Sequence, residues 1–252
     1  MKYNWNWGVL LQQEPGGTGT YLHYLIVGLG WTLATALAAW VIALVIGAAI
    51  GTLRTTTMPW VVRIGNAYVE IFRNIPLIVQ MFLWFFVFPE FLPTALGDAI
   101  KQMPPPWGSY IPAVLCLGIF TSVRVAEQVR AGIQSLPRGQ RMAGTAMGLT
   151  QYQTYRYVIL PQAFRIILPP LTSEFMNVIK NSSVALTIGL LELTGRARAM
   201  QEMTFQVFEA FAAATVIYLL TNLVVVLGMR ALEHKVRVPG LIAAGGAPQA
   251  GH

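Results

Sequence analysis

The sequence reads QRMAGTAMGLT over residues 140–150 and continues to a Leu160-Pro161 pair. Apolar residues recur in this stretch at near-helical spacing among polar ones, which predicts a short helix; they are Met142, Ala143, Ala146 and Met147. Gly148 interrupts that helix, and Thr150 is suited to cap a second one. Pro161 stands where a further helix can begin. The alternative is an ordinary connecting loop, but long segments of this kind, above about 12–15 residues, are more often functional or disordered. The ordered pattern favours an element that docks on another protein.

The composition around this stretch is that of a membrane protein. Hydrophobic residues make up 55% of the chain and charged residues only 11%, whereas soluble domains carry roughly a quarter charged residues. The basic residues lie between apolar runs and not in one patch with aromatic residues, which excludes a nucleic-acid partner. Cys116 is the only cysteine, so neither an internal disulfide nor a thiolate metal site is expected.

Five apolar segments are long enough to cross a bilayer, which takes about 20 mostly apolar residues per helix. They are expected at about residues 21–53, 75–92, 110–130, 166–190 and 210–229. The segments are too long for barrel strands and do not alternate apolar with polar residues. We therefore predict an all-α polytopic membrane protein with one transmembrane domain over residues 1–240 and a flexible tail over residues 241–252. The first seven residues lack the order of a signal peptide, so the first segment is expected to stay in the mature protein.

The positions of arginine and lysine predict the orientation. Basic residues are concentrated after the first, third and fifth segments, and that side is expected to face the cytoplasm. The N-terminus is then outside and the C-terminus inside. The segment of about residues 134–161 lies in the cytoplasm, and the Pro104-Pro105-Pro106 turn lies outside.

With this placement, the opening stretch resembles the cytoplasmic loop of ABC-importer permeases. The family pattern is Glu-Ala-Ala, three residues, Gly, nine residues, an aliphatic residue, one residue and Leu-Pro. The counterparts here are Met142-Ala143-Gly144, Gly148, Val158 and Leu160-Pro161. The spacing is kept throughout, although Met142 replaces the Glu of the pattern and Gly144 its second Ala. The resemblance implies that this loop couples the membrane domain to an ATPase through Gln140, Met142, Ala143, Gly144, Gly148, Leu160 and Pro161.

Other stretches resemble the polar amino-acid branch of these permeases. They cover residues 68–80, 127–135 and 160–165, while residues 4–8 and 120–139 are most similar to a permease subunit of bacterial glutamate/aspartate importers. This resemblance implies a non-catalytic subunit of the bacterial inner membrane that works with two cytoplasmic ATP-binding subunits, a second permease subunit, expected to be a homologue, and a periplasmic amino-acid-binding protein. The sequence has no Gly-Lys pair and hence no P-loop. No cofactor is therefore expected in this chain, and the partner ATPase would bind ATP and magnesium.

Polar residues in the fourth segment are candidates for the substrate pathway. Glu174, Asn177 and Asn181 follow one helical face, and Ser182 lies beside them. Such residues at membrane depth usually face a cavity or the bundle interior, although polar contacts between helices are the alternative. Arg124 and Glu127 in the third segment are further candidates for the pathway. Arg124 suits a substrate carboxylate because its guanidinium binds carboxylates bidentately. The competing interpretation is an ion pair between Arg124 and Glu127, one turn away.

Several other functions are weighed against this one. The same importer type could carry glutamine or a basic amino acid. An ion-coupled secondary transporter would commonly show internal repeats of broken helices, and none is visible. A membrane enzyme would need a catalytic cluster, whereas the three histidines are dispersed and no metal-ligand set is found. A passive channel would have no use for an ATPase-docking loop.

Overall fold

The computed structural model of the chain describes residues 3–17 and 19–236. Within these ranges the regular structure is helical, apart from one isolated bridge between Gln13 and Thr20. The α-helices are α1 (Tyr21–Leu53), α2 (Pro59–Asn74), α3 (Leu77–Phe82), α4 (Thr94–Lys101), α5 (Trp107–Gln134), α6 (Arg138–Ala146), α7 (Gln151–Thr154), α8 (Leu160–Asn181), α9 (Leu193–Thr204) and α10 (Val207–Val236). Short 3₁₀ or π turns are η1 (Trp7–Leu11), η2 (Leu83–Val87), η3 (Phe88–Phe91), η4 (Tyr155–Ile159) and η5 (Ser182–Ile188). The all-α prediction is confirmed for the described residues.

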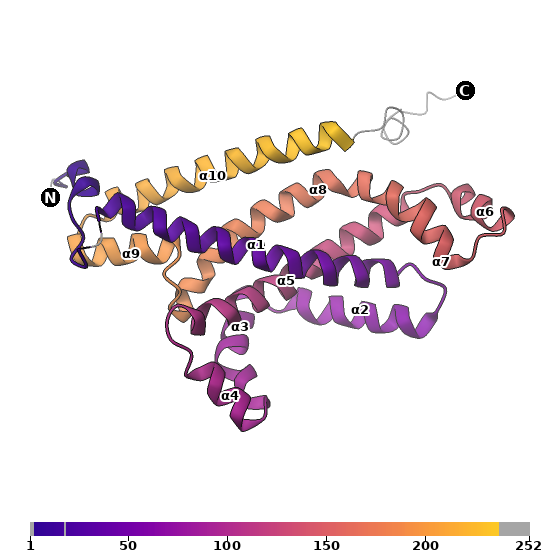
Figure 1. Ribbon diagram of the computed structural model, residues 1–252, viewed down its shortest axis with the longest axis horizontal. Helices are drawn as coiled ribbons and strands as arrows, with labels where there is room; N and C mark the ends of the chain where they lie inside the picture. The colour runs from indigo at the N-terminus through magenta and orange to yellow at the C-terminus, as the bar shows by residue number, and fades with distance from the viewer. Residues whose placement is uncertain (1–2, 18, 237–252) are drawn as a thin grey trace.

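The long helices lie side by side along the long axis of the molecule (Figure 1). α1 packs along α5, α5 along α8, and α8 along α10, while α2 lies beside the C-terminal part of α1. α6 and α7 lie at one end of this bundle, and the N-terminal residues and α9 lie at the other. The predicted tail at residues 241–252 lies outside the described residues.

Helices α1 and α5 approach each other closely because small residues line their contact. A Cβ atom on Gly47 would lie 2.7 Å from the carbonyl oxygen of Ser122, and one on Gly51 would lie 2.6 Å from that of Ala126. Small residues of this kind let helix backbones come together where lipid gives no hydrophobic driving force. This contact holds α5, which carries Arg124, directly against α1.

The segment expected to cross the membrane at about residues 75–92 does not begin as a straight helix. α2, which the sequence analysis missed, ends at Asn74, and Ile75 is extended with φ −97° and ψ 124°. The cause is Pro76, whose ring disfavours the helical conformation for the residue before it. The helical segment from Leu77 to Phe91 is bent by 101° from α2. The Gln80 side chain fills the break by donating to the carbonyl of Ile75 at 3.0 Å.

Three of the described helices are long and apolar enough to cross a membrane, and the bent pair of α2 with the segment to Phe91 would make a fourth. These three are α1, α5 and α10, which cover three of the five expected segments. α8 covers most of the fourth expected segment, but it contains Arg165, Glu174 and Lys180 and is not among them. Five crossings therefore remain a prediction.

Candidate functional site

The loop that opened the sequence analysis has the predicted local structure. α6 ends at Ala146, and Gly148 has a left-handed φ of +77°, a conformation that glycine adopts without steric cost. Thr150 then caps α7 in a capping box. The backbone N–H of Gln153 donates to the Thr150 hydroxyl at 3.2 Å, and the backbone N–H of Thr150 donates to the side-chain carbonyl of Gln153 at 2.8 Å. Two side-chain–backbone bonds thus fix the bend between the helices.

The same segment presents apolar side chains to the outside. Met142 on α6 is 71% exposed, and Met147 and Tyr157 are exposed as well. Exposed apolar residues grouped in a polar segment mark an interaction surface. Gly144 lies on the opposite face, where a Cβ atom would come within 2.8 Å of the Thr154 side chain. The segment therefore packs tightly inward and leaves its outer face free to dock.

α7 continues almost without interruption into α8. The π turn η4 joins them, and α8 begins at Leu160 with Pro161 in its first turn. Gln162 donates to the Gln140 side chain at 3.4 Å and so connects α8 to α6. A helix thus begins at Leu160-Pro161, as predicted, and its start is attached to the candidate docking segment.

Arg124 on α5 faces Glu174 on α8. The Arg124 Nη1 atom lies 3.6 Å from Glu174 Oε2, an ion-pair distance longer than a hydrogen bond. That carboxylate oxygen is buried and has no hydrogen-bond partner. The Glu174 side chain is 13% exposed and that of Arg124 is 46% exposed. The pair is loose and open on the arginine side, and it brings together two residues that the sequence analysis selected.

Among the ion pairs of the described residues, the competing pair between Arg124 and Glu127 does not occur. Glu127 instead binds Arg54, at the end of α1, at 2.9 Å, and Arg130 at 3.7 Å. Arg54 also donates to the Asn66 side chain at 2.8 Å, so the network ties α1, α2 and α5 together. The side chain of Arg54 is only 5% exposed, and a buried guanidinium needs such partners. Sequence spacing pointed to a neighbour one turn away, whereas the better partner comes from another helix.

The other candidate residues of the fourth segment differ in their surroundings. Asn177 and Asn181 follow Glu174 on α8, and both are half-buried. Ser182 is fully buried, and its hydroxyl donates to the carbonyl of Ile179 at 2.8 Å. The Ser182 hydroxyl is thus used within its own helical turn.

A fully buried carboxylate that the sequence analysis missed lies at the start of α9. Glu192 accepts hydrogen bonds from the Thr32 hydroxyl at 3.2 Å, the Tyr218 hydroxyl at 2.9 Å and the amide of Gly195 at 2.8 Å. These bonds connect α1, α9 and α10. The residue caps α9, and a Glu at this position carries no sequence signal as strong as Ser, Thr or Asp.

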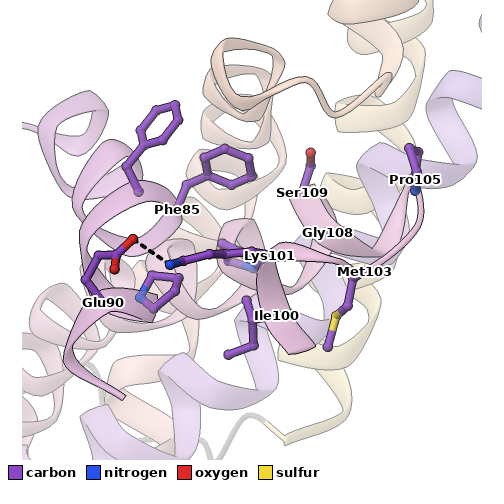
Figure 2. A pocket seen from close by; sticks show the side chains of 11 residues that line it. Phe85, Glu90, Ile100, Lys101, Met103, Pro105, Gly108 and Ser109 are labelled. Carbon is purple, nitrogen blue, oxygen red and sulfur yellow. Dashed lines mark ion pairs between the residues drawn. The ribbon is translucent and has the colours of Figure 1, made fainter. Parts of the chain in front are cut away.

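A pocket of about 380 Å³ opens between η2, η3, α4 and the start of α5. Figure 2 shows Lys101 reaching toward Glu90, with Phe85 above them and Met103 and Pro105 at the far side. The Lys101 ammonium lies 2.6 Å from the Glu90 carboxylate, and this hydrogen bond raises the pKa of Lys101. Both side chains are largely exposed, so this pair is a surface feature of modest energy.

Comparison with known proteins adds independent findings. The model of a family described as "binding-protein-dependent transport system inner membrane component" matches residues 43–238. The chain is 48% identical over 241 residues to the glutamate/aspartate import permease protein GltJ of Escherichia coli K12, covering 95% of this chain and 98% of that protein. It is 31% identical to the glutamate/aspartate import permease protein GltK of Escherichia coli O6:H1, covering 88% and 93%. A crystal structure of an amino acid ABC transporter with histidines superposes with a TM-score of 0.71 at 30% identity, covering 85% of this chain and 95% of that one.

Proposed function

Because this chain belongs to the family of binding-protein-dependent transport system inner membrane components, we propose that it forms half of the membrane pathway of an ATP-driven importer of glutamate and aspartate. It is a non-catalytic, multi-pass permease subunit of the inner membrane. The observation that carries the substrate assignment is the 48% identity to a glutamate/aspartate import permease over nearly the whole of both chains.

The proposed topology has five passes, with the N-terminus outside and the C-terminus in the cytoplasm. The passes are α1, the bent segment from α2 to η3, α5, α8 and α10. Two features support this arrangement. First, α6 and α7 lie at one end of the bundle, opposite the N-terminus (Figure 1). Second, arginines are concentrated in the segments at that end of the bundle, as expected for a cytoplasmic side.

The coupling mechanism follows from the docking segment. Two ATPase subunits bind and hydrolyse ATP, and one of them receives the outer face of α6 and the Gly148 bend. Since α7, η4 and α8 form a nearly continuous helical rod, a displacement at the docking segment moves the rod that carries Glu174. The motion of the ATPase is thereby delivered to the candidate pathway.

The pathway itself uses the loose pair of Arg124 and Glu174. A glutamate or aspartate side chain brings a carboxylate that competes with Glu174 for the Arg124 guanidinium. The released Glu174 carboxylate then forms an ion pair with the substrate ammonium group, and Asn177 and Asn181 offer further hydrogen bonds. This exchange keeps charges paired at membrane depth, where an unpaired charge is costly.

The other half of the pathway is proposed to be a second, homologous permease subunit. This chain is similar to two different permease proteins, GltJ and GltK, whose names give the same substrates. A periplasmic binding protein would deliver the amino acid to the outer side of the pair.

The test is uptake by the full complex in proteoliposomes with ATP inside and a panel of labelled amino acids outside. Glutamate and aspartate should be taken up and should compete with each other, while glutamine and arginine should not compete. Transport should stop when ATP is replaced by a non-hydrolysable analogue. Preferential uptake of glutamine or arginine would refute the substrate assignment, and uptake driven by an ion gradient without ATP would refute the transporter class.

A further inference from the structure

A second groove, of about 370 Å³, lies where the end of α1 and the start of α2 meet α7 and η4. It lies at the end of a 33-residue helix, longer than the roughly 20 residues that cross a bilayer core. In the topology proposed above, this end is at the cytoplasmic membrane surface. For a lipid to bind there, the groove must lie at the level of lipid headgroups and the upper acyl chains.

The lining of the groove is apolar and its rim is positive. Leu53, Met58 and Tyr152 supply exposed apolar surface. Arg156 also lines the groove and is exposed. The Arg141 guanidinium lies over the ring of Tyr155, another lining residue, at 5.5 Å from its centroid. The lining residues include no Asp or Glu, so the charge of the site complements an anion with an apolar tail.

The groove is held in shape by hydrogen bonds. The Tyr155 hydroxyl donates to the backbone carbonyl of Thr55 at 2.7 Å, which fastens η4 to the end of α1. η4 is a π turn, a feature that often occurs at functional sites. Apolar residues from α1 and α2 and the arginine from η4 thereby line one opening.

We propose that this groove binds an anionic phospholipid of the cytoplasmic leaflet. One acyl chain lies against Leu53, Met58 and Tyr152, and the phosphate lies between Arg141 and Arg156. Basic pockets between helices on the cytoplasmic side of a membrane recognise lipid headgroups in this way. The lipid would connect α1 to η4, so its binding would tie the docking segment to the lipid composition of the membrane. The proposal requires a membrane protein in this orientation and is independent of the transported substrate.

The test uses the complete complex with its ATPase and partner permease in a mild detergent, titrated with phosphatidylglycerol or with phosphatidylcholine of the same chains. Native mass spectrometry counts the bound lipids. Phosphatidylglycerol should bind more tightly than phosphatidylcholine. Arg156→Gln should weaken the binding of phosphatidylglycerol about fivefold, which is the effect of one basic residue near a charged headgroup. The binding of phosphatidylcholine should not change. Arg138→Gln removes the same charge from the same segment but not from the groove lining, and should have no effect.

A second variant tests the apolar part of the site. Met58→Trp fills the groove from an exposed position and should lower the affinity for both lipids while the complex stays assembled by size-exclusion chromatography. Equal binding of the two lipids to the wild type, or an Arg156→Gln variant that matches Arg138→Gln, would overturn the proposal. So would displacement of the signal by inorganic phosphate alone, which would indicate a free-anion site. Cross-linking of a Tyr152→Cys variant to the ATPase would also overturn it, by showing that a protein covers the groove.

Discussion

At the scale of single residues, the geometry of the Arg124–Glu174 pair suits a substrate pathway better than a structural contact between helices. Its distance of 3.6 Å and the unpartnered carboxylate oxygen indicate a contact that a ligand can replace at low cost. The Arg54–Glu127 pair, at 2.9 Å with a buried arginine, has the opposite character. The two pairs therefore predict different responses to the same kind of substitution.

Arg124→Gln should lower glutamate uptake by roughly tenfold or more, the effect of losing a hydrogen bond to a charged group. ATPase activity without substrate and assembly should change little. The double variant Arg124→Gln/Glu174→Gln separates the two interpretations. If the pair only neutralises charge, the double variant should recover uptake; if Arg124 binds substrate, uptake should stay low. Arg198→Gln, which breaks the exposed Arg198–Glu202 pair on α9, is the matched control.

Glu127→Gln should destabilise the protein without a specific effect on the substrate. It leaves the Arg54 guanidinium buried and short of a counter-charge, which should cost about 2–3 kcal/mol, less than a fully buried pair because the Glu127 side chain is 35% exposed. The thermal unfolding temperature of the purified complex should fall. Glu70→Gln breaks the exposed Glu70–Arg73 pair and should leave the unfolding temperature nearly unchanged. Equal shifts for the two variants would contradict this ranking.

At the scale of elements, the bend at Gly148 sets the direction of the docking segment. Gly148→Val places a β-branched residue at φ +77°, which should cost on the order of 1–3 kcal/mol and displace α6 relative to α7. Uptake should fall at least tenfold, while the ATPase becomes uncoupled or dissociates. Gly139→Ala, in open space on α6, should transport normally. Normal uptake by Gly148→Val, measured beside that control, would exclude the docking role.

The docking segment could be predicted from sequence because its signals are local. Gly148, the capping residue Thr150 and Pro161 each act within a few residues, and all three have the expected roles. Pro76 is itself a sequence signal for the break, but the apolar run at residues 75–92 predicts a single span, and α2 lies outside all five expected segments. Pairings between helices could not be derived. Spacing along one helix suggested Glu127 for Arg124, whereas the fold brings Glu174 to Arg124 and Arg54 to Glu127.

At the scale of the whole molecule, the proposed topology makes a labelling prediction. Cys116 is buried, so the wild type should react little with a membrane-impermeant thiol reagent. Leu11→Cys, an exposed position near the N-terminus, should be labelled on intact spheroplasts. Met142→Cys, in the docking segment, should be labelled only after the membrane is opened and the ATPase is removed. Labelling of Met142→Cys on intact spheroplasts would invert the orientation.

The glycine contact between α1 and α5 limits how the bundle can change shape. Where Gly47 and Gly51 meet Val125 and Val129, there is no layer of long side chains that could re-pack as one helix slides over the other. α1 and α5 should therefore turn as one rigid body during a transport cycle. The bend at residues 74–76 and the π turn η4 lie outside this contact, and they are the natural hinges about which the remaining helices swing.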